Sequence, residues 1–385
     1  MSDKQGRCIN ASKIELIQQM SIETMTDFEI APCLLEGALA EAGRSFTDAA
    51  RDIGDRPFAS VLRAWCVPYL FTAMEQLLEN GENPVDGINS AMRALAKLLI
   101  QADATGFKMI EMGDSEPSVD GESADKDVKE ITGDHYGNLF KAFSSRSYWA
   151  EPVDLLKQRL ERNGISRSDI ENKTVLDSGC GGGRYSVAWR LLGANPVVGL
   201  DISPINIEDA NRRVELAKLD GISFKEGNVL ELPFKDNEFD IVFSNGVLHH
   251  TTDWKQGISE LVRVLKPGGL GWLYLIENPG GVFWDTIEIL RVVMKNEDKA
   301  TSRQSLQLLN MPANRIFYML DHVMVPINLR LPTGEIESCL RSSGAVDIRR
   351  LNRGADLDRI ERIYLNERYA SERFGIGESR YVFSK

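Results

Sequence analysis

The first 110 residues carry apolar side chains at the spacing of amphipathic helices. After Pro84, for example, Ile88, Met92, Leu95 and Leu99 recur every three or four residues. No stretch in this region alternates apolar and polar positions over the length of a strand. The pattern predicts a separate all-helical N-terminal domain over residues 1–112.

From residue 135 onward, short apolar runs alternate with helical stripes. The helical stripe at residues 254–265 ends at Pro267 and Gly268. Strands that alternate with helices are typical of a parallel sheet with helices on both faces, so we expect a doubly wound α/β fold over residues 135–385. The predicted strands are residues 174–177, 197–201, 222–224, 239–244, 270–276 and 346–351.

Three stretches break this alternation. Residues 113–134 begin with an acidic run that has almost no large apolar side chain, which predicts a linker. Residues 278–330 are aromatic-rich and helical, and they follow the fifth strand at the sheet edge where ligands bind. We therefore expect a helical substrate lid there. Residues 356–373, rich in Arg and Glu, predict a solvated helix.

Charge and cysteine content argue against several classes of partner. Residues 1–134 hold 12 Lys and Arg against 24 Asp and Glu, and the rest of the chain is balanced. Neither part has the basic excess that phosphate backbones require, so we expect no nucleic-acid partner. The five cysteines form no C-x-x-C pair, which predicts no metal site. Without a leader pattern or a long apolar run, we expect a cytoplasmic protein with no membrane partner.

The clearest chemical signal is a strand that breaks into a glycine loop. Asp177 ends the strand, and Gly179, Gly181 and Gly183 follow with the spacing G-x-G-x-G. Each glycine lets a ligand or the next helix approach the backbone, and the helix that begins near Arg184 offers N–H groups to a carboxylate. The spacing differs from the G-x-G-x-x-G of dinucleotide sites, which favours S-adenosylmethionine over NAD.

A second acid supports a nucleoside ligand. Asp201 ends the next predicted strand, where a carboxylate can accept both ribose hydroxyls. Ser203 and Pro204 then predict the N-cap and first position of a helix.

Five segments in this order resemble the class I S-adenosylmethionine-dependent methyltransferases, in the branch that includes the ubiquinone- and menaquinone-biosynthesis-type enzymes. The resemblance covers residues 135–280 well and 331–351 loosely, and it implies a mostly parallel, seven-stranded Rossmann-like sheet. The segments are 175–184 (VLDSGCGGGR), 197–203 (VVGLDIS), 224–234 (FKEGNVLELPF), 239–250 (FDIVFSNGVLHH) and 264–269 (VLKPGG).

The resemblance also implies which residues hold the cofactor. Asp177 and the glycine loop would hold its methionine end, Asp201 its ribose, and Asn228 its adenine amine. The family usually has Asp in place of Asn228, but an amide carbonyl can still accept from the amine. The implied cofactor-binding residues are Asp177, Gly179, Cys180, Gly181, Gly183, Asp201, Ile202, Asn228, Val229, Asn245 and Gly246.

Three residues, His249, His250 and Tyr136, are candidates for catalysis. His249 and His250 lie next to the transferred methyl in the resembling family, where either could act as a general base, with His249 favoured, or where the pair could shape the pocket. Tyr136 and Trp149 lie where relatives fold an aromatic segment over the cofactor, and they fit a lid or a core role equally. Glu277 could face the substrate or cap the insertion.

The resemblance implies transfer of a methyl group to O, N or C of a small-molecule metabolite. Residues 244–247 (SNGV) lack the Asn/Asp-Pro-Pro-aromatic motif of enzymes that methylate nucleobase amines. Two alternatives stay open, a protein methyltransferase whose N-terminal domain recruits the substrate and a cofactor-binding scaffold without turnover. The sequence also leaves a homodimer open.

Overall fold

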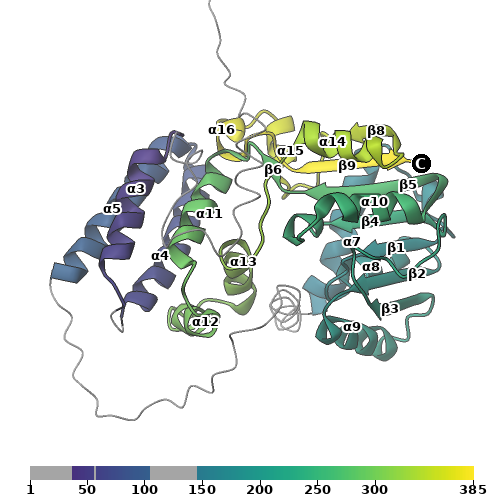
Figure 1. Ribbon diagram of the computed structural model, residues 1–385, viewed down its shortest axis with the longest axis horizontal. Helices are drawn as coiled ribbons and strands as arrows, with labels where there is room; N and C mark the ends of the chain where they lie inside the picture. Colours follow the sequence, from purple (N-terminus) through teal and green to yellow (C-terminus); the bar gives the residue numbers. More distant parts are fainter. Residues whose placement is uncertain (1–36, 56–57, 105–144) are drawn as a thin grey trace, which may run out of the picture. The chain divides into compact units, whose positions relative to one another are not determined.

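The computed structural model describes residues 37–55, 58–104 and 145–385 (Figure 1). The chain divides into two compact units. The helical unit contains residues 37–104 of the described chain together with Asp285–Asn310, and the sheet unit contains residues 145–284 together with Met311–Lys385. Each unit is described by itself.

The helical unit buries the apolar stripes of its helices. Its helices are α3 (Ala40–Asp52), α4 (Ala59–Asn80), α5 (Pro84–Ala104), α12 (Lys299–Gln307) and the part of α11 (Gly281–Met294) that follows Trp284. Phe46, Leu70, Ile88 and Met92 are fully buried. The expected helical N-terminal region is confirmed over the described residues.

Part of the expected lid belongs to the helical unit. The sequence placed all of residues 278–330 in the domain 135–385, whereas the structure groups Asp285–Asn310 with the N-terminal helices. The Arg63 guanidinium of α4 pairs with Glu297 at 2.8 Å, and both side chains are 6% exposed. A Cβ on Gly43 would lie 2.9 Å from Ile289. Helices far apart in sequence thus complete one core, which sequence adjacency cannot indicate. The expected linker, residues 113–134, lies outside the described residues.

The sheet unit is built on a seven-stranded sheet in the order β3-β2-β1-β4-β5-β9-β8. Strands β1 to β5 pair in parallel, and β9 pairs antiparallel with both β5 and β8. This arrangement confirms the expected doubly wound, mostly parallel fold. The strands are β1 (Val175–Ser178), β2 (Val197–Asp201), β3 (Ile222–Glu226), β4 (Phe239–Asn245), β5 (Leu265–Leu275), β8 (Val346–Arg350) and β9 (Ser379–Ser384).

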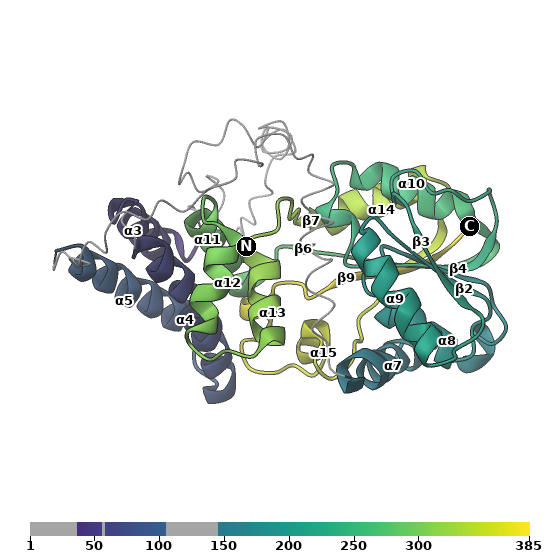
Figure 2. The ribbon, with the colours of Figure 1, turned by 90° about the horizontal axis from the view of Figure 1, so that it is seen from below.

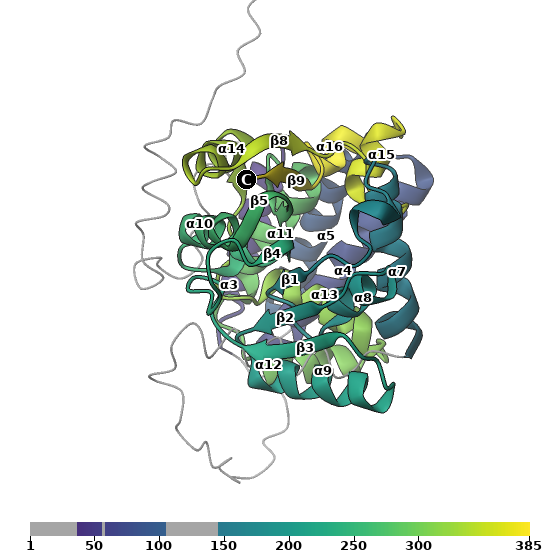
Figure 3. The same cartoon turned by 90° about the vertical axis from the view of Figure 1, so that its right-hand side faces the viewer.

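Alternate strand residues send their side chains to opposite faces of the sheet. Val175 and Trp272 pack in one core with α7 (Ser145–Glu161) and α8 (Arg184–Leu191). Their neighbours Leu176 and Leu273 pack in the other with α10 (Trp254–Val264) and α14 (Thr333–Ser342). Figure 3 shows these helix pairs on the two sides of the sheet, and Figure 2 shows α9 (Pro204–Leu216) beside α8 and α7.

Several short elements complete the sheet unit. β6 (Glu277–Asn278) pairs in parallel with β7 (Leu331–Pro332). The others in the sheet unit are η1 (Arg167–Asp169), η2 (Leu248–His250), α13 (Ala313–Val323), α15 (Arg359–Tyr364) and α16 (Ala370–Phe374). Of the helices within the described ranges, none combines the length and apolar character needed to cross a bilayer.

Candidate active site

The loop between β1 and α8 requires its glycines. Gly179, Gly181 and Gly183 have φ of 81°, 52° and 81°, which L side chains rarely adopt. A Cβ on Gly179 would lie 2.4 Å from the Val247 side chain, closer than real Cβ atoms approach. The N–H groups of Gly179 and Cys180 both donate to the Leu200 carbonyl, at 2.8 and 2.9 Å. The loop is therefore bound to the end of β2.

The first turn of α8 presents backbone N–H donors at the end of this loop. Gly183 occupies the N-cap and has no side chain to satisfy the first N–H groups of the helix, which begins at Arg184. Such a helix start is a site for a carboxylate, because N–H groups and the helix dipole both favour negative charge there. Burial raises the pKa of the Cys180 thiol in the same loop, so Cys180 stays protonated.

Tyr148, on α7, hydrogen-bonds to the backbone of the glycine loop. Its hydroxyl donates to the Gly182 carbonyl at 2.7 Å, and the residue is 1% exposed. Sequence reasoning named Tyr136 and Trp149 instead. Trp149 packs edge-on against Tyr148 with ring centroids 5.0 Å apart, and Tyr136 lies outside the described residues. The sequence does show aromatic residues before the first core strand, but their spacing does not identify Tyr148 as the one that contacts the loop.

Asp177 is a buried acid near the end of β1, where the glycine loop begins. Its Oδ2 accepts from the Ser186 hydroxyl at 2.6 Å, and the residue is 2% exposed. Burial, with a contribution from nearby Asp201, raises the pKa of Asp177 to about 7. The carboxyl group therefore anchors α8 to β1 at the point where the loop begins.

Asp201 connects the loop to the end of β2. Its Oδ2 accepts from the Gly181 N–H at 2.8 Å, and its Oδ1 accepts from the Ser203 N–H at 3.0 Å and the Asn206 amide at 3.2 Å. Burial raises the pKa of Asp201. Next to it, Ile202 is half-buried, and Ser203 caps α9 with Pro204 at the first position, as expected.

The expected adenine and sulfonium residues lie at other strand ends of the same edge. Asn228 follows β3, and its Oδ1 accepts from the Leu230 N–H at 3.0 Å, while Val229 is buried. Asn245 ends β4, and Gly246 follows with φ of 84°. Because parallel strands share their carboxyl edge, the fold brings these residues to the edge that carries the glycine loop.

Three buried side-chain oxygens at this edge have no hydrogen-bond partner among the described residues. Among the described residues, nothing hydrogen-bonds to Ser178 Oγ at the end of β1, or to Ser244 Oγ and Asn245 Oδ1 at the end of β4. Unsatisfied buried groups of this kind are uncommon in native proteins, and they point to a polar ligand at the carboxyl ends of β1 and β4.

Comparison with known proteins shows what the sequence around this edge is similar to. Residues 176–273 match the sequence model of a family described as methyltransferase domain. This part of the chain is similar to methyltransferase domains. The glycine loop, the helix start and the unpartnered polar atoms of β1 and β4 fit a ligand that carries a carboxylate and an amine.

Two curated relatives each align with part of the chain. One is 27-O-demethylrifamycin SV methyltransferase of Amycolatopsis mediterranei, 36% identical over 31% of this chain and 45% of that protein. Another is demethylmenaquinone methyltransferase of Lactiplantibacillus plantarum, 38% identical over 25% of this chain and 42% of that protein. The chain thus spans less than half the length of these two relatives.

A solved structure with partial similarity is phosphoethanolamine N-methyltransferase 2 of Haemonchus contortus in complex with S-adenosyl-L-methionine. The two chains are 20% identical, with a TM-score of 0.40, over 66% of this chain and 56% of that one.

The two candidate histidines differ in the nitrogen that carries the proton. The Ile276 N–H donates to His249 Nδ1 at 3.2 Å, so a neutral His249 carries its proton on Nε2. Burial, together with His250 and His322, holds the pKa of His249 well below its usual value. His250 Nδ1 lies 2.7 Å from the Ile327 carbonyl, which can only accept, so Nδ1 is the donor and Nε2 is the nitrogen that can accept a proton.

The segment expected to form a solvated helix instead supplies buried ion pairs. Asp358 accepts two hydrogen bonds from Arg159 and one from Arg380, all at 2.7 Å. Arg359 lies 3.3 Å from Glu277, which follows β5 and is fully buried. The expectation failed because partners for these charges come from α7, β6 and β9, far away in sequence.

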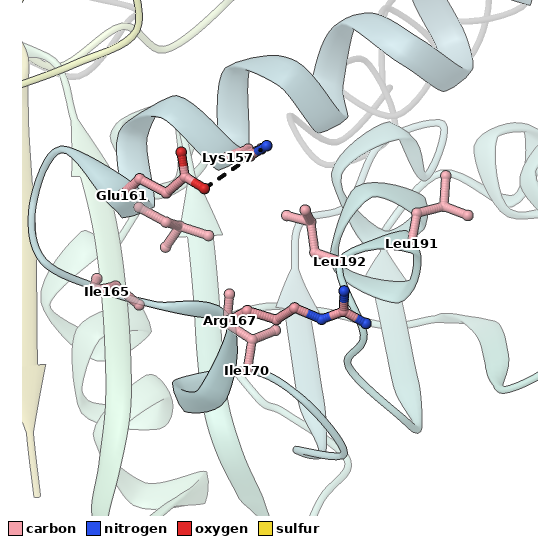
Figure 4. Close-up of a pocket in the computed structure, with 8 residues that line it drawn as sticks. Lys157, Glu161, Ile165, Arg167, Ile170, Leu191 and Leu192 are labelled. Atoms are coloured by element: carbon pink, nitrogen blue, oxygen red, sulfur yellow. Dashed lines mark ion pairs between the residues drawn. The ribbon is translucent and has the colours of Figure 1, made fainter.

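A separate pocket of about 240 Å³ lies at the opposite end of α8 (Figure 4). α8 begins at the glycine loop and ends at Leu191, which lines this pocket. Lys157 and Glu161, one turn apart on α7, line it and form an ion pair at 3.9 Å. The pocket is therefore distinct from the sheet edge that carries the glycine loop. Within the described ranges, no group of three or more His, Cys, Asp or Glu side chains is placed to bind a metal.

Proposed function

We propose that the protein transfers the methyl group of S-adenosylmethionine to an O, N or C atom of a small-molecule acceptor. The observation that carries this proposal is the glycine loop with φ above 50° at three positions, tied by Asp201 to β2 and followed directly by the start of α8. A loop of this geometry presents backbone N–H groups to a carboxylate and leaves Asp201 beside the nucleoside position.

In this reaction the acceptor attacks the methyl carbon in line, the carbon–sulfur bond breaks, and the sulfur keeps the electron pair. The protein must then align the two reactants and exclude water, which is worth up to about 7–11 kcal/mol in favourable cases. The buried groups at the ends of β1 and β4 support such a role because they can orient a polar ligand without rearrangement.

His250 is the better candidate for removing a proton from the acceptor. Its Nδ1 proton is committed to Ile327, which leaves the basic lone pair on Nε2. His249 has the opposite tautomer and a lowered pKa, so it suits holding the end of β5 and donating a hydrogen bond from Nε2. This order reverses the preference for His249 that sequence position favours.

The proposal is tested by incubating the full chain with methyl-labelled S-adenosylmethionine, once with a metabolite extract and once with a protein extract. We expect label in small molecules. Label in protein would support recruitment by the N-terminal helices instead. Binding of the cofactor without transfer to either extract would support the scaffold alternative.

A further inference from the structure

Glu277 presents one buried carboxylate oxygen that lacks a partner. The residue lies in β6, directly after the carboxyl end of β5, and it is fully buried. Its Oε1 accepts from Trp284 Nε1 at 2.7 Å and lies 3.3 Å from the Arg359 guanidinium. Among the described residues, none hydrogen-bonds to Oε2. A buried acceptor left unsatisfied destabilises the fold unless a ligand completes it.

The charges around Glu277 are already balanced. Arg159, Arg359 and Arg380 face three carboxylates, with distances of 2.7 Å from Asp358 to both Arg159 and Arg380. The remaining contacts, at 3.3 to 4.0 Å, join Glu277 and Glu378 to Arg359 and Arg380. Within this cluster of described residues, three guanidinium groups therefore offset three carboxylates, so the cluster itself supplies no surplus positive charge for an anionic ligand. An added carboxylate would instead bring a second acidic group beside Glu277, whose pKa is already raised by burial.

A buried donor lies on the segment beside the histidine pair. Leu329 N–H donates to the His249 carbonyl and Leu331 N–H to the Ile276 carbonyl, both at 2.9 Å. Between these anchors and Ile327, the Asn328 side chain presents a buried Nδ2 to which no described residue hydrogen-bonds. Because His249 also bonds to the Ile276 N–H, the segments that carry Asn328 and Glu277 meet at His249.

Two aromatic residues lie beside Glu277. Arg359 donates to the Tyr274 hydroxyl at 3.2 Å, which places the Tyr274 side chain beside Glu277. A Cβ on Gly246 would lie 3.5 Å from the Tyr274 ring, so this ring also reaches the end of β4, where Asn245 presents its unpartnered oxygen. Trp284 contributes an indole whose N–H donates to Oε1 of the same carboxylate.

We propose that the methyl acceptor is an uncharged, ring-bearing compound whose hydroxyl donates to Glu277 Oε2 and accepts from Asn328 Nδ2. A hydroxyl is the small neutral group that satisfies one acceptor and one donor together. Glu277 is then the residue that discriminates against carboxylic acids. This inference rests on the proposed methyl-transfer function. A site that reads a hydroxyl through buried polar groups can reject analogues that lack it by up to ~10⁴–10⁵-fold.

The test uses the full chain loaded with S-adenosylhomocysteine and three probes, 4-fluorophenol, 4-fluorobenzoate and fluorobenzene. Fluorine NMR at pH 7 measures the dissociation constant of each, because the phenol is then neutral and the benzoate ionised. We expect the wild type to bind the phenol at least tenfold more tightly than the other two. Equal affinity for all three, preference for the benzoate, or no binding of the phenol would overturn the proposal.

Variants separate recognition from a purely structural role. Glu277→Gln keeps an oxygen for Trp284 but replaces the unpartnered acceptor with a donor, so the phenol-to-benzoate preference should fall at least tenfold. Asn328→Leu, in a half-buried segment, should weaken phenol binding about tenfold even if Glu277→Gln does not fold. Glu215→Gln, on the exposed face of α9, is the matched control and should keep the preference.

Two outcomes distinguish this inference from the function on which it rests. Unchanged preference in a folded Glu277→Gln protein, or unchanged phenol affinity in Asn328→Leu, would overturn the role of these residues. Failure of the wild type to bind S-adenosylhomocysteine at all would instead contradict the proposed function.

Discussion

At the residue scale, local hydrogen bonds decide what each polar group can do. The sequence places two histidines side by side and cannot tell them apart. Their ring centroids lie 4.2 Å apart in the structure, yet one ring accepts from a backbone N–H and the other donates to a carbonyl. The distinction depends on Ile276 and Ile327, whose positions follow from tertiary contacts that the local motif does not contain.

Replacing His250 with Ala should lower kcat by about 10²–10⁴ if the acceptor loses a proton during transfer, because the basic lone pair of His250 is on Nε2. The wild-type rate should then rise with pH through the imidazole range. Steady-state kinetics with the acceptor found by labelling measures both. His249→Asn is the comparison, and it should keep the pH dependence. A flat wild-type profile together with an active His250→Ala variant would show that alignment alone suffices.

Asp177 should make the cofactor-free protein less stable as pH rises. Its pKa is raised from 3.8 to about 7, so the folded state holds a proton that the unfolded state releases. The stabilisation is complete below about pH 4 and is lost as pH rises through 7. Urea unfolding at pH 5 and pH 8 measures this loss. The free energy of unfolding of Asp177→Asn, relative to that of the wild type, should rise by a few kcal/mol from pH 5 to pH 8. A constant difference between the two proteins would contradict the raised pKa.

At the scale of elements, the regular α/β part was predictable and the C-terminal part was not. The strand expected at residues 197–201 matches β2, and the helix expected at 254–265 matches α10 within one residue, because their apolar periodicity is strong. β9 was missed, since Tyr381, Val382 and Phe383 follow a long charged stretch and pair only with distant β5 and β8. β5 begins earlier than expected because residues 265–269 continue the strand.

The contact from α7 to the glycine loop should contribute to cofactor binding. Tyr148→Phe removes the hydrogen bond to Gly182 without changing the ring, so we expect a loss of about 1 kcal/mol in unfolding free energy. The affinity for S-adenosylmethionine should fall severalfold because the loop loses a support. Calorimetry and urea unfolding measure the two effects. Tyr364→Phe, at an exposed position on α15, should change neither, and an unchanged Tyr148→Phe protein would show that the loop needs no such support.

At the scale of the whole molecule, the chain leaves the sheet unit after Trp284 and returns at Met311. The sequence predicts that residues 135–385 fold without the first 112 residues. The structure gives a different expectation, because α11 and α12 complete the core of the helical unit, with Ile287, Leu290 and Leu306 fully buried.

A fragment of residues 135–385 should therefore aggregate or melt well below the full chain, since its inserted helices would expose apolar faces. Replacing residues 285–310 of that fragment with a flexible Gly-Ser linker should restore a soluble protein that binds S-adenosylmethionine. Light scattering and thermal melts of the two fragments test this. A stable, monodisperse 135–385 fragment with its insertion intact would show that these helices do not need the N-terminal ones.

The most direct test of the account is a calorimetric titration of the full chain with S-adenosylmethionine and with NAD. We predict micromolar binding of S-adenosylmethionine, about −8 kcal/mol, and no binding of NAD. Asp201→Ala should weaken the binding at least tenfold, because this carboxylate holds the Gly181 N–H and is the proposed ribose contact. Asp220→Ala, at an exposed position before β3, should bind like the wild type. Binding of NAD, or full S-adenosylmethionine affinity in Asp201→Ala, would contradict the account.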